Sequence, residues 1–155
     1  MRYLYHVAPK MYKESILERG LIIWENSPAT ESINSYLELY KPNNITFDRS
    51  KCIFFYTKLK DCISFNDDIY RINVKDLDLD KLYVVEYTYA QNIWQDLEDA
   101  PYTGEYAPIP TKESAKLYWK SLRPYQEYLK DKKEYIILEC LYLDNVPWTK
   151  LTLLK

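Results

Sequence analysis

Residues 3–23 read YLYHVAPKMYKESILERGLII, and this stretch carries the clearest local signals of the fold. Its first five residues are rich in aromatic and β-branched types, which predicts a β-strand that ends at Pro9. Residues 10–19 have the spacing of a weakly amphipathic helix, and Gly20 stands where a C-cap glycine belongs. The stretch therefore predicts a strand, then a helix, and then a short extended segment at 21–24.

Outward from this stretch, five more segments predict β-strands, either by alternation or as short apolar runs. These segments are residues 51–57, 69–74, 81–89, 134–142 and 146–154. The last two flank Asp144-Asn145, a turn signal that predicts a closing β-hairpin.

Predicted helices lie between these strands. They cover residues 58–67, 91–99 and 111–129. Pro124 should kink or end the third helix early, because proline removes a backbone donor and clashes with the preceding turn. Residues 25–50 form a long connection with one helical turn near 33–39. This order predicts a single α+β domain over residues 1–155, with a mainly antiparallel sheet and flanking helices.

The composition excludes several classes of protein. The chain has 155 residues, with 21 basic and 23 acidic side chains, and its net charge of −2 leaves no electrostatic footprint for nucleic acid. No apolar run approaches the roughly 18 residues of a membrane helix, so no membrane partner is expected. The first ten residues lack the apolar core of a signal peptide. We therefore expect a cytoplasmic protein.

Glycine and cysteine usage exclude further chemistries. The only two glycines, Gly20 and Gly104, cannot form a dinucleotide-binding GxGxxG turn, a phosphate-binding P-loop or a GxSxG elbow. The three cysteines, Cys52, Cys62 and Cys140, have no CxxC spacing, and the chain has one histidine. We therefore predict reduced cysteines in the core and no metal site.

Three segments, taken in order, resemble the ADP-ribosyltransferase fold. The first is Leu4-Tyr5-His6-Val7-Ala8 with the following helix and Gly20-Leu21. The second is Ile53-Phe54-Phe55-Tyr56 with Phe65 further along, and the third begins Glu134-Tyr135-Ile136-Ile137. Their arrangement is similar to the branch with a His-Tyr-Glu motif, which includes diphtheria-type toxins and poly(ADP-ribose) polymerases. About twenty positions match, spread over residues 3 to 154.

This resemblance implies a split antiparallel β-sheet and an enzyme that uses NAD as its substrate. The implied activity is mono-ADP-ribosyl transfer: the nicotinamide–ribose bond is cleaved and ADP-ribose moves to a macromolecular acceptor. The slight acidity of the chain favours a protein acceptor over nucleic acid. The implied role is that of an effector, a toxin or a phage-type modifier. The alternative is a binding module with the same fold that has lost the chemistry.

The first motif implies a role for His6, whose imidazole would hydrogen-bond a ribose hydroxyl of NAD. A lone histidine on a half-buried strand can instead bond to backbone. The backbone at Val7 would clasp the nicotinamide amide, although relatives usually have glycine there. Ala8 also departs from the motif, since it replaces a hydroxyl residue.

The second motif implies that an aromatic pair holds the nicotinamide ring, since stacking on aromatic faces binds such rings. The pair would be Phe65 with either Phe54 or Tyr56, which share one face of their strand. Spacing favours Phe54, whereas the resembled family usually has tyrosine. Phe55, on the opposite face, is expected in the core.

The third motif implies that Glu134 stabilises the positive charge that develops on the ribose. A solvated glutamate beside Lys133 is the plainer alternative. Glu139 is the weaker candidate, and we expect its change to glutamine to cost little activity. Lys132 stands where arginine-modifying relatives carry a second acidic residue, so arginine is not the expected acceptor. The chain is also not basic enough to favour removal of a 2′-phosphate from RNA.

Overall fold

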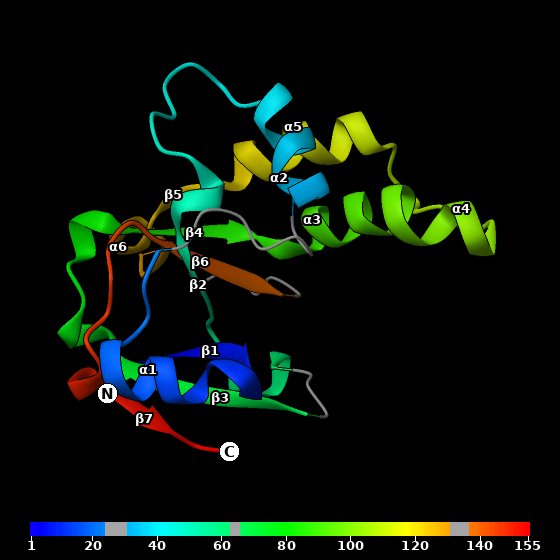
Figure 1. Ribbon diagram of the computed structural model, residues 1–155. Helices are drawn as coiled ribbons and strands as arrows, with labels where there is room; N and C mark the ends of the chain where they lie inside the picture. The colour runs from blue at the N-terminus through cyan, green and yellow to red at the C-terminus, as the bar shows by residue number, and fades with distance from the viewer. Residues whose placement is uncertain (24–30, 63–65, 131–136) are drawn as a thin grey trace.

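The computed structural model describes residues 1–23, 31–62, 66–130 and 137–155, and it contains one seven-stranded antiparallel β-sheet (Figure 1). The strand order is β5-β4-β6-β2-β1-β3-β7. The strands are β1 (Tyr3–Pro9), β2 (Ile53–Tyr56), β3 (Asp67–Asn73), β4 (Leu82–Glu86), β5 (Arg123–Pro124), β6 (Leu138–Tyr142) and β7 (Leu151–Leu153). The predicted α+β class with a mainly antiparallel sheet is therefore confirmed.

Six α-helices flank the sheet in the part of the chain listed above. They are α1 (Lys13–Arg19), α2 (Glu31–Leu39), α3 (Tyr87–Trp94), α4 (Ala100–Thr103), α5 (Thr111–Ser121) and α6 (Tyr125–Tyr128). A π-helical turn joins α3 to α4, and Figure 1 shows this long helical stretch extending away from the sheet.

The sheet is divided by a seam between β1 and β2. These two strands share a single residue pair, Tyr5 with Tyr56, whereas β1 pairs with β3 over its whole length. Figure 1 accordingly shows β4, β6 and β2 as one group and β1, β3 and β7 as another. We refer to these groups as the β2–β6–β4–β5 half and the β1–β3–β7 half.

The two faces of the sheet are packed differently. On one face, a first core spans both halves, because Leu4, Phe55 and Tyr70 belong to one buried cluster together with Ile16 of α1. On the other face, a second core joins β2, β4 and β6 to helices α2, α3 and α5. Neither the buried members of this second cluster nor the side chains packed against it come from β1, β3 or β7.

The junction after α1 forms as predicted. Gly20 has φ 80°, a left-handed value that favours glycine, and its N–H donates to the Ile16 carbonyl at 2.8 Å. A Cβ at this position would lie 2.0 Å from the Val146 carbonyl oxygen, which leaves no room for a side chain. Leu21 then pairs with Val146, so the predicted extended segment begins as an isolated β-bridge.

Several predicted boundaries are wrong. The strand predicted over 81–89 ends at Glu86, and residues 87–94 are helical. The connection 25–50 contains the nine-residue helix α2 rather than a single turn. The helix predicted over 111–129 ends early, at Ser121, as expected ahead of Pro124, which lies in the edge strand β5, where its missing N–H costs no interior ladder bond.

The predicted closing hairpin is also wrong. β6 pairs with β2 and β4, while β7 pairs with β3 at the opposite edge of the sheet. The turn side chains bond to distant segments instead: Asp144 Oδ2 accepts from Lys81 Nζ at 2.8 Å, and Asn145 Oδ1 accepts from the Ile23 N–H at 2.8 Å. These contacts direct the chain towards Leu21, so it does not fold back on β6.

Candidate functional site

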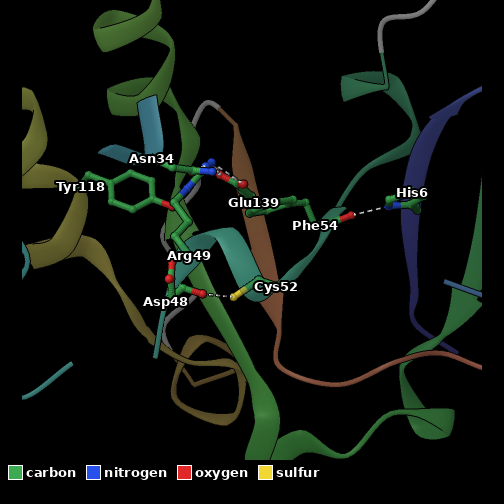
Figure 2. A network of polar contacts seen from close by, with 8 residues as sticks. All are labelled: His6, Asn34, Asp48, Arg49, Cys52, Phe54, Tyr118 and Glu139. Atoms are coloured by element: carbon green, nitrogen blue, oxygen red, sulfur yellow. Dashed lines mark hydrogen bonds and ion pairs between the residues drawn. The ribbon is translucent and has the colours of Figure 1, made fainter. Parts of the chain in front are cut away.

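His6 lies at the seam and bonds across it. Its Nδ1 is 2.8 Å from the Phe54 carbonyl oxygen on β2 (Figure 2). Because a carbonyl only accepts, Nδ1 must carry the proton and Nε2 must present a lone pair. Burial lowers the pKa of His6, and the bond to Phe54 only partly opposes this shift. The imidazole is therefore neutral at pH 7 and offers one acceptor.

His6 and the predicted aromatic clamp lie on opposite faces of the sheet. The His6 ring contacts Phe55 edge-on, with centroids 5.9 Å apart, so it lies on the face of the first core. Phe54 and Tyr56 alternate with Phe55 and point to the opposite face. His6 thus meets the backbone of Phe54 and not its ring.

The structure distinguishes the two candidate stacking residues. The Arg49 guanidinium carbon lies 4.7 Å from the centroid of the Phe54 ring, and that ring packs against the second core. Tyr56 is half-buried, and its ring contacts Tyr87 edge-on at 5.9 Å. Burial raises the pKa of Tyr56, so its phenol stays protonated at neutral pH. Of the two, Tyr56 is the better placed to meet a ligand.

Val7 follows His6 on β1 and is half-buried, paired with Ile69 of β3. The other two predicted site residues, Phe65 and Glu134, lie outside the described residues. The nearest described residue after Glu134 is Ile137, whose carbonyl accepts from the Tyr87 N–H at 3.1 Å. Because Tyr87 also contacts Tyr56, Ile137 lies close to the seam tyrosine.

Glu139, ranked as the weaker glutamate, belongs to a buried ionic network centred on Arg49 (Figure 2). Arg49 Nη2 donates to both carboxylate oxygens of Glu139, at 2.9 and 3.2 Å. Arg49 Nε donates to the Tyr118 hydroxyl at 2.7 Å, and its Nη1 donates to Asn34 Oδ1. Burial raises the pKa of Glu139, an effect that the Arg49 charge opposes. Every nitrogen of the guanidinium is therefore bonded within the protein.

Sequence reasoning missed this network. A usable signal was present, because Glu139 stands inside the apolar run Leu138-Glu139-Cys140-Leu141 of a central strand. A carboxylate in such a run is buried and needs a cationic partner. The chain pattern did not indicate that the partner is Arg49, 90 residues away.

The cysteines lie in the core. Cys52, Cys62 and Cys140 are all buried free thiols. Burial raises the pKa of Cys62 to about 11 and that of Cys52 to about 12. Within the described ranges, no group of three or more His, Cys, Asp or Glu side chains could hold a metal ion.

Comparison with known proteins finds no matching family model, no matching curated protein and no matching solved structure. No described helix combines the length and the apolar character needed to cross a membrane.

Proposed function

We propose that this protein is an NAD-dependent mono-ADP-ribosyltransferase with an ADP-ribosyltransferase-like split sheet. The observation that carries the proposal is the seam. Tyr56 from the second motif forms, with Tyr5, the one residue pair that joins the two halves of the sheet. His6 from the first motif follows Tyr5 and bonds to the β2 backbone, with its ring on the opposite face from Tyr56. The backbones of the two motifs therefore meet at the seam, which supports a common site there.

In the proposed reaction, the bond between nicotinamide and the ribose C1′ breaks and nicotinamide leaves with the electron pair. A nucleophile of the acceptor then bonds to C1′ and loses a proton. The transition state resembles the oxocarbenium ion of glycoside hydrolysis. Binding the ribose and stabilising its positive charge are therefore the two tasks of the site.

Named residues are available for these tasks. Because His6 and Tyr56 point to opposite faces of the sheet, one ligand meets both only within the seam, where the Nε2 lone pair of neutral His6 would accept a hydrogen bond from a ribose hydroxyl. The half-buried Tyr56 ring stacks on the nicotinamide. Glu134 supplies the negative charge beside C1′. The proposed acceptor is a protein, in keeping with the net charge of −2.

The test is release of nicotinamide from NAD, with and without candidate acceptor proteins. Tyr56→Ala should weaken NAD binding about tenfold, because stacking contributes about 1–3 kcal/mol per ring. Tyr102→Ala is the matched control, since that tyrosine is 90% exposed on α4. Equal activity and NAD affinity in wild type and Tyr56→Ala would contradict the proposed site.

A binding module without catalysis is the second candidate. It is favoured by the internal bond of His6 Nδ1 and by the Arg49 contact on Phe54. Exposed aromatic side chains such as Tyr102 and Tyr106, 90% and 67% exposed, would suit a protein interface. NAD binding without nicotinamide release, under every acceptor condition, would favour this module over the enzyme.

A further inference from the structure

Arg71 on β3 lies in the same row of residues as the seam tyrosines. The register pairs Tyr56 with Tyr5, Tyr5 with Arg71, and Arg71 with Thr152. Residues paired in this way point to the same face of a sheet. Because neighbouring strands are about 4.8 Å apart, Arg71 is about 10 Å from Tyr56 along this row.

In the β1–β3–β7 half, the second core does not cover the face that carries this row, although Ile69 on the same face is 7% exposed. The second core, which covers this face in the other half, includes no residue of β1, β3 or β7. Tyr3, Tyr5 and Arg71 are accordingly half-buried, and Thr152 is exposed. A ligand that stacks on Tyr56 can therefore extend across Tyr5 towards Arg71 without displacing a described helix.

The charge of Arg71 is not matched within the described ranges. Its guanidinium carbon lies 4.3 Å from the centroid of the Tyr3 ring, and none of the ion pairs there includes this arginine. An aromatic ring attracts the cation but accepts no conventional N–H···O bond. The contact with Tyr3 therefore positions the guanidinium and leaves its N–H groups available.

We propose that Arg71 binds the pyrophosphate group of a nucleotide whose nicotinamide end stacks on Tyr56. The inference rests on the proposed function and names the residue that recognises the anionic part of NAD. A guanidinium matches phosphate oxygens with two parallel hydrogen bonds, which an ammonium cannot do. Tyr5 lies between the two ends of the ligand, where the ribose would pass.

The experiment is calorimetric titration of the full chain with ADP-ribose, ADP and adenosine, comparing wild type with Arg71→Gln. We expect the affinity for ADP-ribose and ADP to fall tenfold or more, because hydrogen bonds between charged groups are among the strongest in proteins. The affinity for adenosine, which has no phosphate, should not change. Arg71→Lys should recover only part of the loss.

Arg19→Gln is the matched control, since Arg19 is an exposed arginine on α1 that bonds to Ser15 Oγ at 3.3 Å. Thermal unfolding of each variant checks the fold. Equal affinity of wild type and Arg71→Gln for ADP-ribose would overturn the inference, as would an equal loss for adenosine. A wild type that binds neither ADP-ribose nor ADP would also overturn it, and nicotinamide release from NAD decides the proposed function separately.

Discussion

Arg49 and Arg71 are two arginines beside differently built halves of one sheet: Arg49 lies in the 3₁₀ turn before β2, and Arg71 lies on β3. Arg49 is 4% exposed and bonds to Glu139, Tyr118 and Asn34 under the helices of the second core. Arg71 is half-buried in the other half, on the face that the second core does not cover there, and contacts the Tyr3 ring. The first arginine completes the interior of the protein, and the second remains able to bind an anion.

The difference shows why buried charge alone does not identify a functional site. The Arg49–Glu139 pair is the most deeply buried ionic group among the described residues, yet every nitrogen of its guanidinium is bonded within the protein. A group that binds ligand needs unused hydrogen-bonding capacity and access. By this criterion the seam and the β1–β3–β7 half are the candidate site, and the Arg49 network is structural.

The largest expected effect is on stability. Arg49→Met should lower the free energy of unfolding by about 3–5 kcal/mol, because it leaves the Glu139 carboxylate buried without its partner. The double variant Arg49→Met, Glu139→Leu should recover much of this loss, since both charges are gone. Urea unfolding measures both values. Arg71→Met is the comparison variant. A loss of stability as large as that of Arg49→Met would contradict the conclusion that only Arg49 is part of the protein interior.

The next effect is on catalysis. Glu134→Gln should reduce the rate of ADP-ribosyl transfer by about 10²–10³, the usual cost of losing one preorganised electrostatic group. NAD affinity should change much less, because stacking and backbone contacts supply most of it. Transfer at a nearly wild-type rate would show that Glu134 is not the catalytic glutamate.

The control variant for Glu134→Gln must be a glutamate that is not part of the buried network. Glu139→Gln is unsuitable, because this glutamate is 4% exposed and paired with Arg49, so its variant should lose stability. Glu127→Gln is the matched control, since Glu127 is an exposed glutamate on α6. It should leave both transfer and stability unchanged.

A smaller effect should appear in the pH dependence of stability. His6 is the only histidine, and burial lowers its pKa in the folded state below the usual value of about 6.5. The unfolded chain therefore binds the proton first, so stability is complete above pH 6.5 and is lost as the pH falls below it. The slope should not exceed about 1.4 kcal/mol per pH unit.

Two variants separate the roles of the His6 nitrogens. Asparagine can replace the Nδ1 donor to Phe54, so His6→Asn should keep the fold, lose NAD turnover and show no such pH slope. Glutamine reaches towards the Nε2 position, so His6→Gln should lose more stability than His6→Asn. Unfolding curves at pH 7.5 and 5.5 measure these effects. An unchanged pH slope in His6→Asn would mean that other groups cause it.

The smallest effect concerns thiol reactivity. Cys62 follows β2, whereas Cys52 lies in the second core near Arg49. Since the pKa of Cys62 is about 11 and that of Cys52 about 12, Cys62 should react first with a thiol reagent at pH 8, and all three should react slowly until the chain unfolds. Rapid reaction of Cys52 in the native protein would show that the second core does not shield this thiol from solvent.

The features that could be predicted from the amino-acid sequence are local. The strand at residues 3–9, the helix that follows and its glycine cap were predictable because their signals lie within about twenty neighbouring residues. The burial of Phe55 followed from alternation along one strand. The α+β class with antiparallel pairing followed from the order of such elements.

Contacts between distant residues could not be predicted and depend on how the whole chain folds. β7 pairs with β3 and not with β6, Arg49 reaches Glu139 on another strand, and Arg71 shares a row with Tyr56. Each of these depends on strand order and register, which set partners tens of residues apart. Periodicity along a chain predicts which face a side chain occupies, but it carries no information about which strand will lie beside it.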